Sequence, residues 1–137
     1  MVVDASVAVK WFLPEIHFEA ARRALKGRRN LLAPDLIWAE VGNTLWKKAL
    51  RKEINDEEAG GILDDFTRFP LQIYGLKPLL GAAWEMAREL GVSVYDGLYL
   101  ALAVGQGCSM ITADRKFYEL LQKKPLVAKI IWVEEID

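Results

Sequence analysis

Four acidic residues stand at positions where their side chains could bind a divalent cation. Asp4 directly follows a short apolar run at the start of the chain, and Asp114 follows another apolar run near the end. Glu40 and Asp96 each lie in a stretch of largely apolar residues. A carboxylate in such surroundings needs water or a counter-charge, because burying an unpaired charge is costly. Together these four residues predict one acidic cluster.

A cluster of carboxylates favours binding of a hard cation. No lysine or arginine is adjacent to Asp4, Glu40 or Asp96 in the sequence, so the mutual repulsion must be relieved in another way. The chain has a single histidine and a single cysteine, which cannot complete a zinc site. Ligation by oxygen alone favours Mg²⁺ or Mn²⁺. Such a cation can stabilise the transition state of phosphodiester hydrolysis, which would let a nearly neutral protein cleave a polyanion.

The four acids are expected to differ in role. We expect Asp4 and Asp96 to bind the cation directly, and Glu40 and Asp114 to hold its waters or a second ion. Each acid also has a structural alternative: Asp4 and Asp96 could cap helices, Asp114 could belong to a turn, and Glu40 could be a surface residue. One of the carboxylates could orient the attacking water, and the sequence does not say which.

Alternating strands and helices should position these acids. Apolar runs predict strands near 1–4, 30–33, 71–74, 109–112 and 129–133. Helical spacing and stop signals predict helices over 6–13, 15–26, 35–51, 55–69, 78–90, 95–105 and 116–122. This order favours an α/β fold with a central parallel sheet of four to five strands flanked by helices. In such sheets, sites form at the carboxyl ends of the strands, where Asp4 and Asp114 are expected.

Length and composition limit the alternatives. The chain has 137 residues, 53% of them hydrophobic, which predicts one domain over 1–137 with a sizeable core. Its formal net charge of -1 is not that of a strongly basic nucleic-acid binder, so binding of nucleic acid must rest on local basic patches or on a metal. The lone cysteine and the absence of a long apolar run favour a cytoplasmic protein with no membrane segment.

Four motifs resemble those of PIN domains, in particular the VapC-type toxins of prokaryotic toxin–antitoxin pairs. They are VVDASVAVKWF at 2–12, PDLIWAEVGNTL at 34–45, VYDGLYLALA at 94–103 and ITADRKF at 111–117. Each motif alone is weakly specific, but all four occur in order across almost the whole chain. The resemblance implies a single PIN-like domain and a metal-dependent endoribonuclease. It further implies a small antitoxin partner that occupies the site, and a homodimer.

The resemblance also extends to single residues. Asp4, Glu40, Asp96 and Asp114 match the four acids of the family. Ser6 and Thr112 match its small hydroxyl positions and are expected to hydrogen-bond the acids and hold their rotamers. Asn43 matches the polar residue one turn after the helical acid, and its spacing places it on the same helix face as Glu40.

Basic and aromatic residues are candidates for contacts with RNA and with partners. Arg115 could contact a phosphate, although a solvated turn residue is the plainer interpretation. Lys47 and Lys48 belong to a basic cluster that continues through Arg51 and Lys52, on the same expected helix as Glu40. A second basic cluster consists of Arg22, Arg23, Lys26, Arg28 and Arg29. Four tryptophans at core-like helical spacing are expected to pack in the interior, although an exposed subset could form a dimer or antitoxin surface: Trp11, Trp38, Trp46 and Trp84.

Two other classes of protein deserve comparison. A receiver-like phosphoacceptor domain would need adjacent acids after the first strand, where this chain has only Asp4. It would also need a lysine directly after Thr112, where the chain has alanine and aspartate. A non-catalytic binding module with a PIN fold would not need four intact acids. Binding of Mn²⁺ that depends on the carboxylates would separate the enzyme from such a module.

Overall fold

A five-stranded parallel sheet forms the centre of the computed structural model, which describes residues 1–26, 29–125 and 128–137. The strand order is β3-β2-β1-β4-β5, and every neighbouring pair is parallel. The strands are short: β1 (Val2–Val3), β2 (Leu32–Pro34), β3 (Gln72–Tyr74), β4 (Met110–Thr112) and β5 (Ile130–Trp132). The α/β class and the parallel sheet expected from the sequence are therefore confirmed.

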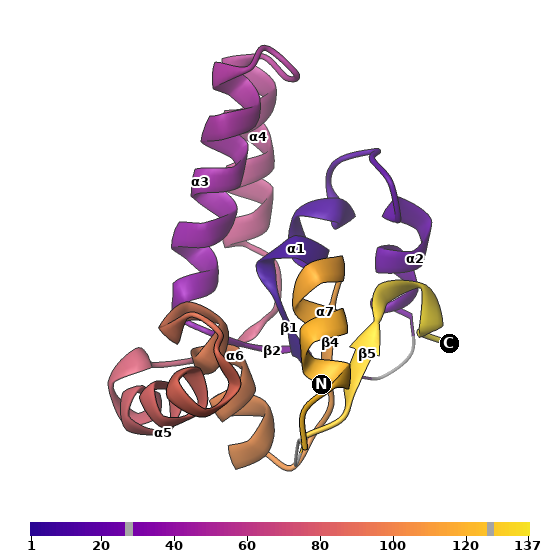
Figure 1. The fold of residues 1–137 in the computed structure, drawn as a ribbon. Coiled ribbons are helices and arrows are strands. Elements are labelled where there is room, and N and C mark those ends of the chain that lie inside the picture. Colours follow the sequence, from indigo (N-terminus) through magenta and orange to yellow (C-terminus); the bar gives the residue numbers. More distant parts are fainter. Residues whose placement is uncertain (27–28, 126–127) are drawn as a thin grey trace.

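Helices cover the sheet and extend beyond it (Figure 1). Those near the N-terminus are α1 (Ala5–Ala8), the 3-10 helix η1 (Val9–Trp11) and α2 (Phe18–Arg23). The middle of the chain forms α3 (Leu36–Leu50), α4 (Asp56–Thr67), α5 (Leu76–Leu90) and α6 (Val94–Gly105). The C-terminal part forms α7 (Arg115–Gln122) and the 3-10 helix η2 (Val133–Glu135).

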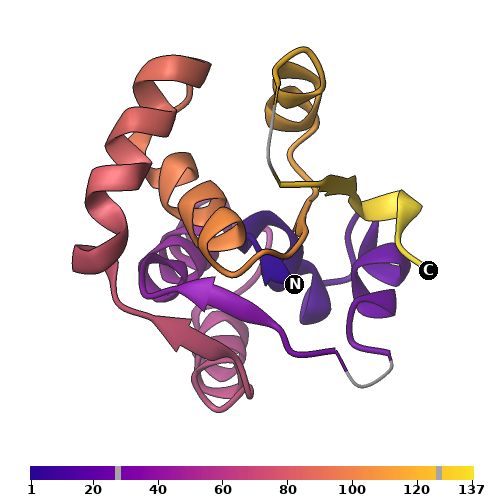
Figure 2. The same cartoon turned by 90° about the horizontal axis from the view of Figure 1, so that it is seen from below.

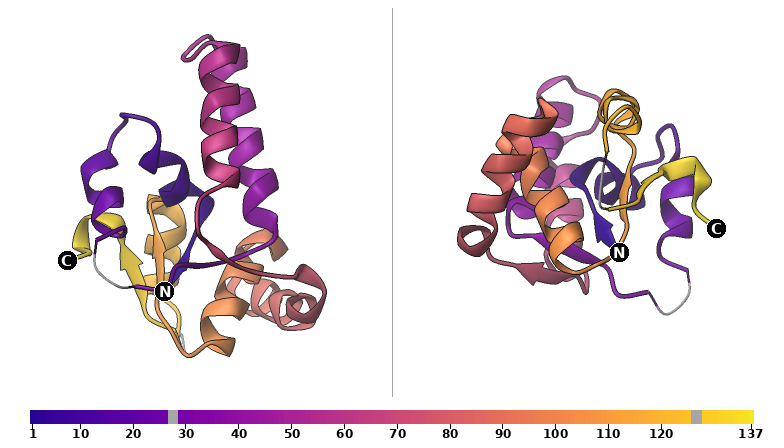
Figure 3. Two further views of the ribbon diagram at one scale, coloured as in Figure 1. Left: turned by 180° about the vertical axis from the view of Figure 1, so that it is seen from behind. Right: turned by 60° about the horizontal axis from the view of Figure 1, so that its bottom comes forward.

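The helices fall into three groups. Helices α3 and α4 pack side by side as an arm that projects from one end of the sheet (Figures 1 and 3). Helices α5 and α6 pack tightly together on one flank of the molecule (Figure 2). Helices α2 and η2 lie on the opposite flank, and α7 packs against β5. Because α1 and α3 directly follow neighbouring strands β1 and β2, they begin at the same edge of the sheet.

Local sequence signals explain most helix ends. Asn55 and Glu58 form a capping box at the start of α4, which begins where the helix at 55–69 was predicted to begin. Gly91 ends α5 with a left-handed φ of 72°, a conformation that glycine adopts without strain. The first two helices are shorter than predicted. The segment expected to be helical at 6–13 forms the short helices α1 and η1. The segment expected at 15–26 becomes helical only at Phe18, because the backbone of His17 has a left-handed conformation. The helix stop expected at Gly27 lies outside the described residues.

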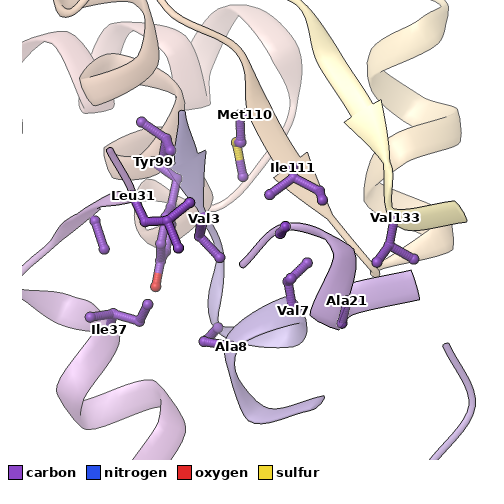
Figure 4. Close-up of a cluster of buried hydrophobic side chains, with 14 of the residues drawn as sticks. Val3, Val7, Ala8, Ala21, Leu31, Ile37, Tyr99, Met110, Ile111 and Val133 are labelled. Carbon is purple, nitrogen blue, oxygen red and sulfur yellow. The ribbon is translucent and has the colours of Figure 1, made fainter. Parts of the chain in front are cut away.

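The core lies between the sheet and its helices (Figure 4). Val3 of β1 and Ile111 of β4 are fully buried beside Val7 of α1 and Tyr99 of α6. Two of the tryptophans expected in the interior are not there, since Trp46 is 58% exposed and Trp84 59% exposed. Helical spacing predicted buried positions for them on α3 and α5, but the structure leaves most of both side chains exposed. No helix in the described ranges is long and apolar enough to span a membrane.

Candidate active site

Asp4 sits at the carboxyl end of the central strand β1 and caps the helix that follows. Its Oδ1 accepts hydrogen bonds from the backbone N–H groups of Ser6 (2.8 Å) and Val7 (3.2 Å), and from the Ser6 hydroxyl. Its Oδ2 accepts a hydrogen bond from the Thr112 hydroxyl of β4. The side chain is held in one orientation by two neighbouring strands, and the residue is only 8% exposed.

Ser6 and Thr112 connect Asp4 to the segment that carries Asp114. The N–H of Ala113 donates to Ser6 Oγ at 2.9 Å, and the N–H of Asp114 donates to Thr112 Oγ1 at 3.1 Å. Asp114 is exposed and caps α7, where its Oδ1 accepts from the Phe117 N–H at 3.0 Å. A short hydrogen-bond network thus joins the carboxyl ends of β1 and β4, and one acid follows each of these strands.

Glu40 of α3 turns a half-buried carboxylate toward Tyr99 of α6. Glu40 Oε1 and Tyr99 Oη are the two buried side-chain polar atoms without a hydrogen-bond partner among the described residues. Burial is the largest cause that raises the pKa of Tyr99, followed by the charge of Glu40, the hydrogen-bonding contact between these two side chains and the charge of Asp4, so the phenol lies close to both acids. Two buried polar atoms that contact each other without a well-formed hydrogen bond mark a place where a further group could bind.

Asp96 lies in the first turn of α6, and Ser93 caps that helix, with its hydroxyl oxygen accepting from the Asp96 N–H at 3.0 Å. The expectation that Asp96 itself could be the cap is therefore wrong. The adjacent Gly97 sets how closely α6 approaches α5: a Cβ on Gly97 would lie 2.4 Å from the carbonyl oxygen of Ala83. This close approach fixes the start of α6, and with it the position of Asp96.

The acids influence one another electrostatically. Burial raises the pKa of Asp4 to about 6, although its hydrogen bonds to Ser6 and Thr112 oppose the shift. Burial raises the pKa of Glu40, and the charge of Asp96 raises it further. Burial likewise raises the pKa of Asp96, with an added contribution from Asp114. Each of the four is therefore linked to another acid of the group or to Tyr99, as expected for a site that needs positive charge.

The donor set fits a hard divalent cation with an incomplete protein shell. Among the described residues, no three Asp, Glu, His or Cys side chains lie close enough together to hold a metal ion jointly, so the four acids do not form the compact cluster expected from the sequence. Mg²⁺ does not require three such side chains, because it retains several waters and commonly binds through one or two carboxylates. The unpartnered Glu40 Oε1 and the raised pKa of Asp4 are the features that a cation would satisfy.

Other candidate residues lie at varying distances from this cluster. Asn43 is exposed on α3, with no hydrogen bond from its side chain in the described structure. The Arg115 guanidinium lies 3.8 Å from the centre of the Trp132 ring, which holds it beside the acid-bearing loop. Lys47 is exposed, whereas Lys48 forms ion pairs with Glu15 and Glu53. In the second basic cluster, Arg28 lies outside the described residues.

Sequence reasoning missed Tyr99 and the ion pairs of Glu15. Tyr99 was hidden within an apolar helix, where a tyrosine indicates packing. Glu15 had no recognisable partner in the sequence, because Lys48 is far away along the chain. Only the spacing of Lys10 and Glu15 around Pro14 could have suggested a contact, and it is a weak signal.

Comparison with known proteins places this geometry in a family. A family model for the PIN domain matches residues 1–121. Ribonuclease VapC3 of Pyrobaculum aerophilum is 36% identical over 121 residues, which cover 87% of this chain and 92% of the relative. The crystal structure of PAE2754 from the same organism superposes with a TM-score of 0.70 at 28% identity, covering 97% of this chain and 83% of that one.

A toxin–antitoxin complex from Klebsiella pneumoniae also superposes, with a TM-score of 0.64 at 14% identity over 94% of this chain and 98% of that one. At this identity the match shows a shared fold. The family model extends across the strands and helices that carry all four acids. The chain therefore belongs to the PIN domain family, and within it to the VapC-type proteins.

Proposed function

We propose that this chain is a divalent-cation-dependent endoribonuclease, that it is the toxin of a toxin–antitoxin pair, and that residues 1–137 form its single nuclease domain. One observation carries the proposal: Asp4 is buried at the end of the central strand, and Ser6 and Thr112 join its carboxylate by hydrogen bonds to the segment that bears Asp114. The similarity to Ribonuclease VapC3 supports RNA as the substrate. We place the activity in the cytoplasm, where such a substrate is found.

The cluster would hold Mg²⁺ or Mn²⁺, with Asp4 and Asp96 as direct ligands and with Glu40 and Asp114 holding its waters or a second ion. The cation would supply positive charge against the negative charge that develops on the phosphodiester oxygens. Neither metal is distinguished by the residues, since both prefer carboxylate and water oxygens.

The protein side chains orient the reacting groups. Ser6 and Thr112 hold the Asp4 carboxylate in one rotamer, so that little reorganisation is needed when substrate binds. Glu40 Oε1 is the atom that we assign to accept the proton of the attacking water, because it has no well-formed hydrogen bond and burial raises the pKa of its carboxyl, which makes it a better base. Arg115, held over Trp132, is placed to contact a substrate phosphate, and Asn43 to support Glu40 from the same helix.

Exposed apolar side chains form candidate surfaces for binding other proteins. Trp46 and Leu50 are exposed on α3, and Leu80 and Trp84 on α5. Large aromatic residues on a surface are enriched where proteins associate. We assign these surfaces to a small antitoxin, the kind of partner present in the Klebsiella pneumoniae complex, and to a second copy of the chain.

Cleavage of RNA by the purified protein tests the function. Single-stranded and structured RNAs are incubated with Mn²⁺, with EDTA as a control, using wild-type protein and the Asp4→Asn and Asp96→Asn variants. The matched control is Asp64→Asn, which removes an exposed carboxylate of α4 away from the cluster. We expect cleavage by wild type and Asp64→Asn, and none in EDTA or in the two site variants.

Two results would refute the proposal. Mn²⁺-dependent cleavage that persists in folded Asp4→Asn would remove Asp4 from the mechanism. No cleavage of any RNA, combined with no carboxylate-dependent binding of Mn²⁺ by calorimetry, would instead identify a non-catalytic PIN-fold module.

A further inference from the structure

A basic hollow adjoins the acidic cluster. It has a volume of about 310 Å³, and its walls include four basic side chains and the single carboxylate of Glu15. The basic residues are Lys10, Lys47, Lys48 and Arg51. Such a concentration of positive charge is notable in a chain whose formal net charge is -1.

The hollow is lined by residues that contact or adjoin three parts of the candidate active site. Ser6, whose hydroxyl donates to Asp4, forms part of its wall, and so does Ala113, which precedes Asp114. Thr44 also lines it and lies one helical turn beyond Glu40, whose carbonyl oxygen accepts from the Thr44 hydroxyl at 2.9 Å. A chain that passes the acids would therefore enter this hollow.

Glu15 bridges two lysines from different parts of the fold. Its Oε1 lies 2.9 Å from Lys10 Nζ on η1, and its Oε2 lies 2.8 Å from Lys48 Nζ on α3. Lys10 is nine-tenths buried, which is unusual for a lysine. Two ammonium groups that converge on a pair of anionic oxygens form an arrangement that also suits a phosphate.

The dipole of helix α3 explains only part of this arrangement. Cations in the last turn of α3 are favoured by the helix dipole, and this accounts for Lys47 and Lys48. It does not account for Lys10, which comes from η1 and is buried against the same carboxylate. Lys47 and Arg51 form no ion pair within the described residues, so the hollow keeps unneutralised positive charge beside the Glu15 bridge.

We propose that Lys10 and Lys48 form a binding site for a backbone phosphate of the RNA next to the cleavage position. Glu15 occupies this site in the free protein as an internal anion that the substrate displaces. The inference rests on the proposed function for the identity of the polyanion. Lys47 and Arg51 would attract the neighbouring phosphates along the hollow. Displacing Glu15 lowers affinity for any short or poorly fitting strand, and so adds selectivity.

Binding of RNA without cleavage tests the site. A short fluorescein-labelled single-stranded RNA is titrated in EDTA over a series of salt concentrations, and binding is followed by fluorescence anisotropy. For Lys48→Gln we expect weaker binding and a salt dependence of log K that is shallower by about 0.7, the contribution of one phosphate contact to a single strand. For Glu15→Gln we expect binding that is about three- to tenfold tighter, because each partly exposed ion pair that need not be broken contributes up to about fivefold.

A matched ion pair elsewhere provides the control. Glu85 and Arg88 form an exposed pair on α5, away from the hollow, so Glu85→Gln and Arg88→Gln should leave the affinity and the salt dependence unchanged. In the Glu15→Gln/Lys48→Gln double variant, the gain from removing Glu15 should shrink, because one of the two freed lysines is absent.

Each outcome bears on one of the two proposals. Unchanged binding by folded Glu15→Gln and Lys48→Gln overturns the phosphate site, even where Asp4→Asn abolishes cleavage and the nuclease stands. Shifted binding, with no cleavage of any RNA and no carboxylate-dependent binding of Mn²⁺ by wild type, supports the phosphate site and overturns the nuclease. If Glu15→Gln unfolds, because Lys10 then lacks its carboxylate, the salt dependence of Lys48→Gln decides: an unchanged slope overturns the site.

Discussion

Substitution of Gly97 by alanine should damage the fold and the active site together. An added Cβ would lie 2.4 Å from the Ala83 carbonyl oxygen, 3.1 Å from its carbonyl carbon and 3.3 Å from its Cα. Real Cβ contacts essentially never fall below 3.0 Å, and all three neighbouring atoms belong to the backbone of α5. The clash cannot be relieved by rotation of a side chain, so α5 and α6 must separate.

Two opposing effects determine how much Gly97→Ala changes the free energy of unfolding. Alanine is preferred over glycine inside a helix by ~0.5–1 kcal/mol. Overpacking a tight contact costs ~1–3 kcal/mol, and the rigid neighbours place this site toward the upper end. We expect a net loss of ~1–2 kcal/mol, which for a domain of this size lowers Tm by about 4–8 °C. Because Gly97 adjoins Asp96, RNA cleavage should fall by more than the loss of folded protein explains.

Gly81 provides the matched control for this measurement. It also lies within a helix, α5, but a Cβ there would meet no atom within 4 Å. Gly81→Ala should therefore raise Tm by about 2–4 °C, since only the helix preference of alanine acts. Thermal unfolding by circular dichroism compares the two variants in EDTA. If Gly97→Ala proves as stable as Gly81→Ala, then the contact between α5 and α6 is not tight and the reasoning fails.

Three further outcomes are expected. In EDTA the raised pKa of Asp4 should destabilise the protein as pH rises. The folded carboxyl has a pKa of about 6 against an ordinary value of 3.8, so a contribution on the order of 3 kcal/mol to the free energy of unfolding is fully present below pH 3.8, is lost progressively as pH rises from 3.8 to about 6, and is absent above that pH. Urea unfolding across this range should show the loss, and a slope equally steep in Asp4→Asn would contradict it. Tyr99→Phe removes a buried hydroxyl without a partner, so the metal-free protein should become more stable by ~1 kcal/mol; a loss in urea unfolding would mean that the hydroxyl is bonded. Trp84→Ser removes a side chain that is 59% exposed in the single chain, and should shift the mass measured by light scattering from that of the proposed dimer to that of a monomer, with Tm falling only as far as loss of the dimer requires. Equal masses for wild type and variant would exclude this surface from the interface.

The order of strands and helices could be predicted because it depends on local patterns. The five strand positions and the long helices α3, α4, α5 and α6 follow from apolar periodicity, capping residues and glycine stops. The early segment was harder, because the helical spacing at 15–26 gives no sign of the left-handed turn at His17. Nor does spacing reveal whether a neighbour exists, which is why Trp46 and Trp84 were assigned to the core.

In the candidate site, too, the residues that follow from local patterns could be predicted, and those that depend on tertiary packing could not. Asp4 and Asp114 could be located because parallel strands end at a common edge. The contacts of Ser6 and Thr112 with Asp4 agree with the positions that the resemblance indicated for them, and their roles in catalysis stay a prediction. Tyr99 and the Glu15 bridge depend on which helix faces which, and that is decided by tertiary packing rather than by any local pattern.

Asp4 shows that a structural role and a functional role need not be alternatives. Its carboxylate caps α1, as the structural interpretation of the sequence held, and the same hydrogen bonds orient it within the acidic cluster. Capping alone does not account for its burial, because an exposed aspartate would cap a helix at no desolvation cost. The additional cost, visible in the raised pKa, is what a site carries when it binds a positive group during function, and it therefore agrees with the cation proposed for this cluster.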